Sequence, residues 1–275
     1  MLRWKEMNIG QILEEMTRIR RLKARVMTNY YNQCQTYKEP MKCQTAPKSC
    51  VFIWPEDGID RVYFYSSDKE ELVQILSNIP QGAVIDYITK DKEDSTAMFL
   101  QAGYKKHLEY GRFVIKQRSK EAEEMEMLLQ SDTSISKQLY DNGYGEPALV
   151  SDAEEIDRQL REKFDPYEAH FYSLEKLREY IKKGWVWVAK ENGKVIAANM
   201  FEIQGVKSYG AYLYNYGSVE VLSALLEKSS EYLSTLGVSY FYCWMNLANK
   251  RILRYNMEYG GYVPDGLYDM IYVKE

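Results

Sequence analysis

The sequence predicts an α/β fold in which two domains each contain a mixed β-sheet. The chain has 275 residues, more than one small hydrophobic core usually organises. Its second half alternates strand-like and helix-like segments in an order that combines hairpins with parallel crossovers. In addition, the stretch "GYKKHLEYGRFVIK" at 103–116 resembles "GYVPDGLYDMIYVK" at 261–274, which indicates an internal repeat.

The composition is typical of a globular protein and argues against several classes of function. Hydrophobic residues make up 45% and charged residues 28% of the chain. A net charge of −4 argues against nucleic acid as a partner, and no apolar run reaches the roughly 20 residues of a membrane span. The N-terminal stretch carries charges throughout, unlike a signal peptide, so we expect a cytoplasmic protein. The spacing of the four cysteines fits no common zinc pattern, so we expect no metal.

The second half is predicted to begin with a strand and two helices. A short strand at 148–150 leads into a helix that Ser151 and Glu154 would begin as a capping box. Ser173 is expected to cap the next helix, and Gly184 to end it because the position requires a left-handed backbone.

Hairpins and crossovers follow these helices. Asn192-Gly193 is a strong hairpin signal, since both turn residues must accept positive φ, and Gly205 marks a second turn. A long helix with a leucine-rich face is expected at 218–236, ended by Gly237. The remaining predicted elements are strands at 207–215, 238–244 and 267–274 and a helix at 246–259.

This order of elements resembles the GNAT superfamily of N-acyltransferases over residues 146–275. The most specific local piece is "NKRILRYNMEYGGY", which is similar to the penultimate helix of that family. In the family an Asn opens this helix, a Tyr lies near its end, and Gly followed by an aromatic residue closes it. The resemblance therefore implies a GNAT-like domain in the second half.

The first half is interpreted as a partial copy of that domain. A constant shift of 158 residues (261 − 103) places Gly103, Tyr104, Tyr110 and Lys116 on Gly261, Tyr262, Tyr268 and Lys274. Asp68 and Glu71 would cap a shorter counterpart of the long helix. We expect a degenerate GNAT-like domain at 1–118, a connector helix and loop at 119–145, and an acyltransferase domain at 146–275. Two unrelated α/β domains are the alternative.

The resemblance implies transfer of an acyl group from coenzyme A to an amine, with acetyl-CoA as the expected co-substrate. In the family the fourth and fifth strands separate and the pantetheine arm lies between them; here these strands are 209–215 and 238–244. The residues implied to contact coenzyme A are Leu213, Tyr214 and Asn215 through their backbones, Gly217 and Ser218 before the long helix, and Asn246, Asn249, Lys250 and Arg251 on the penultimate helix.

The pyrophosphate loop departs from the family pattern, in which Arg or Gln precedes Gly-x-Gly or Gly-x-Ala after two spacer residues. The corresponding stretch "NYGSVEV" has Gly217-Ser218 but no second Gly and no basic residue. Affinity for coenzyme A therefore stays open, and a plain helix N-cap is the alternative interpretation of Gly217-Ser218.

The candidate catalytic residues are a tyrosine acid and two possible bases. Tyr255 could protonate the departing thiolate, because its ordinary pKa near 10 suits that task, while packing is its alternative role. Glu202 and His170 could take the proton of the amine, although either could instead face solvent. The position that matches Tyr255 in the first copy is Phe99, which has no proton to donate, so we expect a non-catalytic first half.

The sequence thus predicts an acyl-CoA-dependent N-acyltransferase that acts on a small-molecule or peptide amine. Two alternatives remain open: a non-catalytic acyl-CoA-binding or scaffold protein of the same fold, and a tandem aminoacyl transferase that uses another acyl carrier. The second alternative would account for the missing pyrophosphate loop. Neither the acceptor nor the oligomeric state is predicted.

Overall fold

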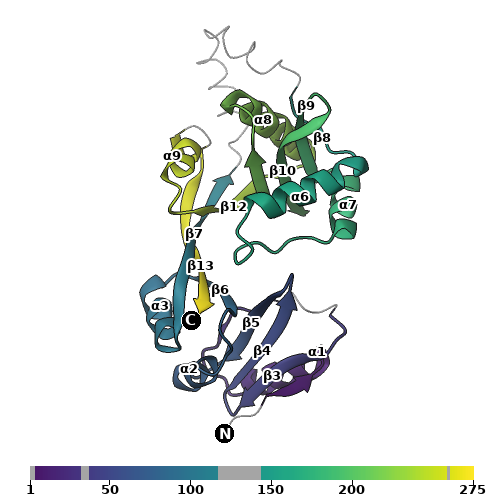
Figure 1. Cartoon of the computed structure of the whole chain (residues 1–275). Coiled ribbons are helices and arrows are strands. Elements are labelled where there is room, and N and C mark those ends of the chain that lie inside the picture. Colours follow the sequence, from purple (N-terminus) through teal and green to yellow (C-terminus); the bar gives the residue numbers. More distant parts are fainter. Residues whose placement is uncertain (1–3, 32–36, 117–143, 259–260) are drawn as a thin grey trace.

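A single mixed sheet runs through both halves of the chain in the computed structural model, which describes residues 4–31, 37–116, 144–258 and 261–275. Within these residues the sheet has 13 strands, twelve of them in the order β1-β3-β4-β5-β6-β13-β7-β12-β11-β10-β9-β8, with β2 paired to β5. Figure 1 shows two lobes, one with α1 to α3 and one with α6 to α8, joined by β7 and β13. Most of the predicted connector, 119–143, lies outside the described residues.

Two helices of the first half are capped by the side chains of the residues that precede them. Asn8 accepts a hydrogen bond from the Gln11 amide at 3.0 Å, and Asp68 caps α2 as predicted by accepting from the Glu71 amide at 3.0 Å. The elements are β1 (Lys5–Met7), α1 (Ile9–Arg20), β2 (Met27–Thr28), β3 (Met41–Ala46), β4 (Ser49–Glu56), β5 (Ile59–Ser66), α2 (Lys69–Leu76), β6 (Val84–Thr89), α3 (Lys92–Gln101) and β7 (Tyr104–Lys116).

The second half follows the predicted order closely. Asn192 and Gly193 both have positive φ (50° and 75°) in the hairpin turn, and Ser173 caps α7. The elements are β8 (Glu146–Pro147), a 3₁₀ turn (Val150–Asp152), α6 (Ala153–Lys163), α7 (Leu174–Lys182), β9 (Val186–Glu191), β10 (Lys194–Gln204), β11 (Lys207–Asn215), α8 (Val219–Thr235), β12 (Tyr240–Asn246), α9 (Lys250–Glu258) and β13 (Val263–Lys274).

Two local predictions about the start of this half are wrong. Residues 148–150 are not a strand, because the pairing with β9 ends at Pro147 and a 3₁₀ turn begins at Val150. Ser151 lies inside that turn and therefore does not cap α6. Asp152 instead accepts a hydrogen bond from the Leu149 amide at 2.8 Å, which closes the turn in place of the expected capping box.

The last strand of each half completes the sheet of the other half. β6 pairs with β13 and β12 pairs with β7, while β7 and β13 pair antiparallel at the centre. In the central ladder Tyr110 faces Asp269 and Gly111 faces Tyr268. A shift of 158 residues converts the first pair into the second (110 + 158 = 268; 269 − 158 = 111), so the centre of the ladder maps onto itself when the halves are exchanged. The two similar stretches are therefore related by pseudo-twofold symmetry.

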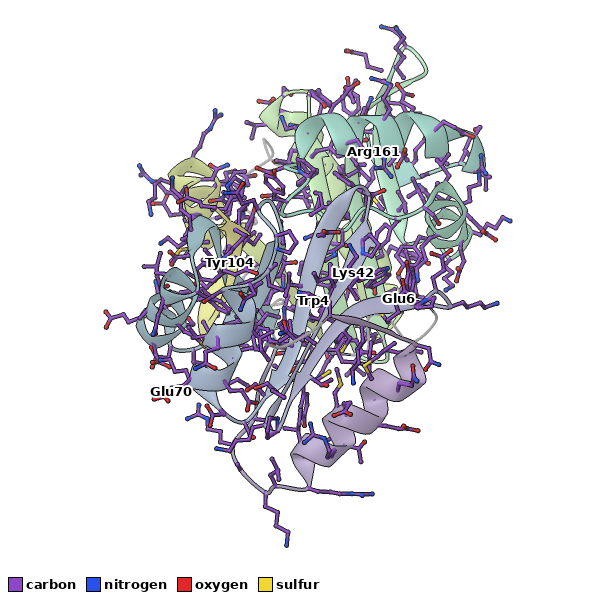
Figure 2. All side chains as sticks on the ribbon, turned by 60° about the horizontal axis from the view of Figure 1, so that its bottom comes forward. Trp4, Glu6, Lys42, Glu70, Tyr104 and Arg161 are labelled. Atoms are coloured by element: carbon purple, nitrogen blue, oxygen red, sulfur yellow. The ribbon has the colours of Figure 1, made fainter. Side chains whose placement is uncertain are left out.

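Helices cover both faces of each lobe. Along β4, Val51 packs under α2 and α3 whereas its neighbour Phe52 packs under α1, as expected for alternating strand residues. Figure 2 shows side chains filling the space between α1 and the strands. In the second half α6 and α7 cover one face and α8 the other, with Met200 and Phe201 of β10 buried on opposite sides. These two faces define where the site residues lie.

Candidate active site

Strands β11 and β12 separate partway along their length, as predicted. They pair in parallel from Lys207 with Tyr240 to Gly210 with Cys243, and the described residues form no pair beyond that point although β11 continues to Asn215. A β-bulge against β10 begins at the same place, since Phe201 faces Gly210 but Met200 faces Tyr212. Because a bulge bends its strand, it accounts for the gap that opens here.

The β11 side of the gap carries the residues predicted to contact coenzyme A. Leu213 is 40% exposed, whereas Tyr214 is buried and its side chain packs into the core. Asn215 turns back on the following loop: its Oδ1 accepts from the Gly217 amide at 2.9 Å and its Nδ2 donates to the Ser218 carbonyl at 2.9 Å. The Gly217 N–H is therefore occupied, and Ser218 serves as the N-cap of α8.

Helix α9 borders the gap on the β12 side and is loosely packed. None of its nine described residues is buried. Asn246 accepts from the Ala248 amide at 2.8 Å, Asn249 caps the helix through the Ile252 amide at 3.2 Å, and Lys250 and Arg251 are exposed. The two asparagine side chains thus stabilise the local backbone, whereas the side chains of Lys250 and Arg251 remain accessible to a phosphate.

Tyr255 connects α9 to α8. Its hydroxyl lies 3.0 Å from the hydroxyl of Ser223 on α8, so the two side chains form a hydrogen bond. Helix α8 follows β11 and helix α9 follows β12, the two strands that separate. Tyr255 therefore lies on the α8 face of the sheet, and it does not line the cavity that contains the predicted bases.

The structure places Glu202 and His170 in one cavity on the α6–α7 face. The cavity has a volume of about 370 Å³ and lies where β11 and β12 separate. Residues from both halves of the chain line it: Asp86, Tyr110, Phe164, Glu168, Ala169, His170, Tyr172, Glu202, Tyr209, Ala211, Tyr212, Trp244, Asp269 and Ile271.

Glu202 is held close to the point of separation. It pairs in register with Tyr209, one residue before Gly210. One carboxylate oxygen accepts hydrogen bonds from Tyr172 at 2.8 Å and Tyr180 at 2.7 Å. Burial, and next the contact with Glu202, raises the pKa of both phenols, so they stay protonated donors. The second carboxylate oxygen is not used by these bonds.

His170 lies between two carboxylates of the first half, which favour its protonated form. Its Nδ1 lies 2.7 Å from a carboxylate oxygen of Glu56 and its Nε2 lies 2.8 Å from one of Asp86. Burial alone would lower the pKa of His170, but the hydrogen bonds to Asp86 and Glu56 outweigh burial and raise it to about 9. The neutral imidazole that we expected for a base is therefore a minor species at neutral pH, and the geometry favours a positioning role.

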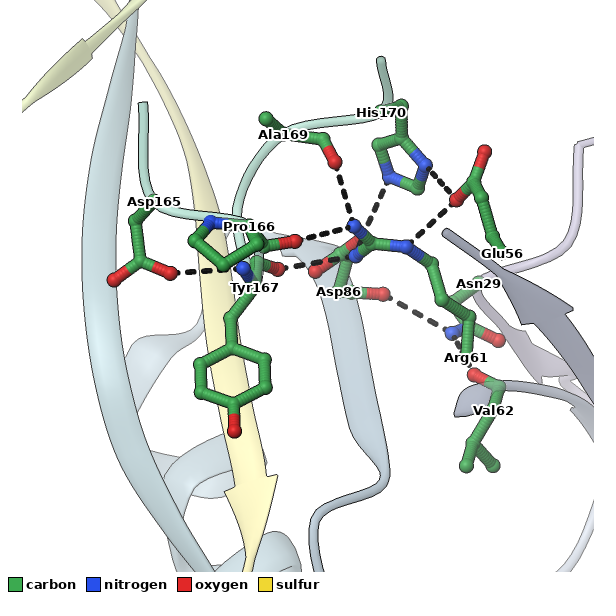
Figure 3. A network of polar contacts seen from close by, with 10 residues as sticks. All are labelled: Asn29, Glu56, Arg61, Val62, Asp86, Asp165, Pro166, Tyr167, Ala169 and His170. Atoms are coloured by element: carbon green, nitrogen blue, oxygen red, sulfur yellow. Dashed lines mark hydrogen bonds and ion pairs between the residues drawn. The ribbon is translucent and has the colours of Figure 1, made fainter. Parts of the chain in front are cut away.

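Arg61 holds the loop that carries His170, and the sequence analysis missed it. The side chain is 3% exposed and forms ion pairs with Glu56 at 2.7 Å and Asp86 at 3.2 Å. Its guanidinium also donates to the carbonyl oxygens of Pro166 (3.1 Å), Tyr167 (3.0 Å) and Ala169 (2.7 Å). Figure 3 shows this network between the two halves. No pattern in the sequence distinguishes this arginine from others on strands.

The corresponding gap in the first half is filled by the chain itself. β5 and β6 share the single pair of Arg61 with Val84. Beyond it, the buried amide of Asn29 donates to the carbonyls of Val62 (2.8 Å) and Asp86 (3.1 Å) and accepts from the Phe64 amide (2.8 Å). Among the described residues, Asn29 therefore bridges these two strands where β11 and β12 are unpaired. That the first half is non-catalytic stays a prediction.

Two further carboxylates face the cavity. Burial, together with the charge of Asp86, raises the pKa of Asp269 to about 7. Burial also raises the pKa of Glu168, although the Tyr110 hydroxyl donates to it. Glu168 lies in the segment around His170 that could line an amine pocket, whereas Asp269 was not a candidate from the sequence, because it lies in an ordinary polar context there.

The described residues contain neither a candidate metal cluster nor a candidate membrane-spanning helix. In the part of the chain that the structure describes, no group of three or more His, Cys, Asp and Glu residues is placed to hold a metal ion. Among the same residues, no helix combines the length and apolar character needed to cross a membrane.

Comparison with solved structures identifies the fold. A tandem GNAT protein from the clavulanic acid biosynthesis pathway aligns over 99% of this chain and 98% of its own, with a TM-score of 0.59 and 9% identity. A GCN5-related N-acetyltransferase from Sphaerobacter thermophilus aligns over 86% and 80%, with a TM-score of 0.55 and 12% identity. A probable N-acyltransferase from Enterococcus faecalis aligns over 98% and 72%, with a TM-score of 0.50 and 12% identity. No protein-family model and no curated protein matched the sequence.

Proposed function

We propose that this chain, which has the tandem GNAT fold, is an N-acyltransferase that uses acetyl-CoA and carries its active site in the second half. The observation that carries the proposal is the separation of β11 from β12 beyond Gly210 and Cys243. The gap lies beside the cavity that contains Glu202, so a thioester in the gap could meet an amine in the cavity.

The gap connects two faces of the sheet that hold different proton-transfer groups. Glu202 lies on the α6–α7 face and Tyr255 on the α8 face. An amine in the cavity would lose a proton to Glu202 and attack the thioester carbonyl, forming the C–N bond. As the C–S bond breaks, Tyr255 would donate its proton to the thiolate. N–H groups alternate in direction along an antiparallel strand, and the Tyr216 N–H donates to the Ile196 carbonyl of β10, so the Tyr214 N–H also points to β10. The N–H groups of Leu213 and Asn215 are therefore the β11 donors that could reach the developing oxyanion.

The residues around the gap suit the pantetheine arm of coenzyme A better than its pyrophosphate. The open edge of β11 and the exposed Leu213 suit a thin, amide-bearing pantetheine arm. Lys250 and Arg251 would meet phosphates from α9. The turn at Gly217 fits the pyrophosphate less well, because Asn215 already occupies that N–H.

The test combines binding with turnover. Acetyl-CoA at 100 times its dissociation constant should stabilise the protein by about 2.7 kcal/mol in a thermal-shift assay. Thiol release with a panel of amines should follow, and Glu202→Gln should reduce kcat/KM by about 100-fold. Glu191→Gln, an exposed charge change on β9, is the matched control. Absence of stabilisation at millimolar acetyl-CoA contradicts the proposal.

A second candidate is an acyltransferase whose donor lacks the coenzyme A pyrophosphate. The occupied Gly217 N–H favours this variant. Comparing acetyl-CoA with S-acetylpantetheine separates the two: similar kcat/KM values favour a donor recognised by its pantetheine arm, and a large loss with S-acetylpantetheine favours coenzyme A itself.

A further inference from the structure

The cavity beside the gap has a surplus of acidic groups. Four carboxylates line it, and His170 is the one basic side chain among its described lining residues. The acids come from four elements of the structure: Asp86 on β6, Glu168 in the loop before α7, Glu202 on β10 and Asp269 on β13. This arrangement favours positively charged ligands.

Asp269 differs from the other three acids because no described residue forms a hydrogen bond or ion pair with its side chain. Asp86 pairs with Arg61 and His170, Glu168 accepts from Tyr110, and Glu202 accepts from two tyrosines. The Oδ1 of Asp269, in contrast, is fully buried and has no hydrogen-bond partner among the described residues. The neighbouring Oδ1 of Asp86 is unsatisfied in the same way.

A buried carboxylate without a partner costs several kcal/mol unless a cation or a proton neutralises it. Such groups are rare in folded proteins and call for a specific explanation. Here the unsatisfied oxygen belongs to a residue that lines a cavity of about 370 Å³, a volume suited to a small organic molecule. A bound cation would supply the missing partner.

Aromatic side chains line the cavity together with Glu202 and Asp269. Burial raises the pKa of the Tyr209 hydroxyl, and the charges of Asp269 and Glu202 add to this effect, so this phenol is near both acids. Tyr209, Tyr212 and Trp244 line the same cavity. Aromatic faces also attract cations, and they would accommodate the methylene groups of an alkylamine.

We propose that the acceptor carries two cationic groups, the amine to be acylated beside Glu202 and a second ammonium or guanidinium that pairs with Asp269. This inference rests on the proposed function and specifies the class of its acceptor. A monoamine of the same length would leave the Asp269 carboxylate unpaired and should bind more weakly.

The proposal also predicts proton release on binding. Because the pKa of Asp269 is near 7, the carboxyl is partly protonated at neutral pH, and a cation beside it would displace that proton. The charged and titratable groups that act on Asp269 or are affected by it are Asp86, His170, Arg61, Tyr31 and Tyr209. The release should therefore be measured in wild type and in an Asp269 variant.

The test is isothermal titration of the full chain with matched amines, without coenzyme A and with saturating coenzyme A. Putrescine, cadaverine and agmatine are the dications, and butylamine and pentylamine are the monoamine controls. The best dication should bind at least about tenfold more tightly than its matched monoamine, a difference of roughly 1.4 kcal/mol. In Asp269→Asn this ratio should fall to about one and proton release should disappear. Asp60→Asn, which removes a carboxylate outside the cavity, should retain both the affinity ratio and the proton release.

Three results would overturn the inference. These are equal affinity for dications and monoamines, a ratio that survives in Asp269→Asn, and no binding of any dication in either condition. Because amine binding is measured without acyl donor, these results are independent of the acetyl-CoA test, whose failure would contradict the proposed function instead.

Discussion

The guanidinium of Arg61, on the first half of the chain, donates a hydrogen bond of 2.7 Å to the carbonyl oxygen of Ala169, on the second half. The residue after Ala169 is His170, whose ring nitrogens lie against Glu56 and Asp86. One wall of the proposed acceptor cavity is thus held in place by Arg61 of the first half. The first half contributes to the site by fixing this loop.

Arg61→Met should therefore loosen the loop and weaken acceptor binding. Removing one partner of a buried ion-pair network typically costs about 3–5 kcal/mol, because the remaining charges stay buried. We expect a loss of that size in chemical denaturation and a higher KM for the amine, with the affinity for acetyl-CoA nearly unchanged. Arg254→Met, at a mostly exposed arginine paired with Glu258, is the control. Equal losses in the two variants would contradict this role.

Asp269→Asn should stabilise the protein at high pH more than at low pH. The folded pKa of about 7 lies above the ordinary value of 3.8, so the folded state binds the proton more tightly than the unfolded state. Wild type therefore loses stability as pH rises from about 4 to above 7, by up to about 4 kcal/mol. The variant lacks this loss. Denaturation curves of wild type and variant at pH 5 and pH 8 measure this difference in stability. A difference between the two proteins that does not change with pH would refute the prediction.

Tyr255→Phe should reduce turnover and leave substrate affinity nearly intact. The phenol donates a proton only as the thiolate departs, so its loss affects kcat, by about 100-fold. The rings have the same shape, and the hydrogen bond to Ser223 is the contact removed. Tyr216→Phe, at a half-exposed tyrosine before α8, is the matched control. Unchanged turnover in Tyr255→Phe would exclude the acid role.

Asn29→Ala should destabilise the first half without affecting coenzyme A binding. The amide satisfies two carbonyls and one N–H between β5 and β6, and unsatisfied buried groups cost about 1–3 kcal/mol each. We expect a loss of at least about 2 kcal/mol in chemical denaturation. Asn78→Ala removes one exposed hydrogen bond and should cost little. A comparable loss at both positions would argue against Asn29 as the filler of this gap.

Signals confined to a few adjacent residues were predictable from the sequence. Asn192-Gly193 specifies its turn because both residues tolerate positive φ. The gap between 209–215 and 238–244 was expected only from the resemblance to the GNAT superfamily. The pairing of β13 with β6 and of β7 with β12 was not predictable. The two strands are similar in sequence because of the repeat, so the local sequence does not determine in which half each strand pairs.

The chemistry of the site depended on contacts that the sequence does not display. Arg61 meets the 166–169 carbonyls across more than a hundred residues, and two carboxylates from the first half set the protonation of His170. Asp269 acquires its raised pKa from burial at the junction of the halves. Sequence reasoning found Glu202 but not the hydrogen bonds that Tyr172 and Tyr180 donate to it.

Amide hydrogen exchange with and without acetyl-CoA tests the central claim most directly. The account predicts that acetyl-CoA slows exchange at 211–215 and 244–246, where β11 and β12 have separated, and leaves 61–66 and 84–89 unchanged, where Asn29 fills the equivalent space. Unchanged exchange along β11 and β12 at saturating acetyl-CoA, or equal protection of β5 and β6, would contradict it.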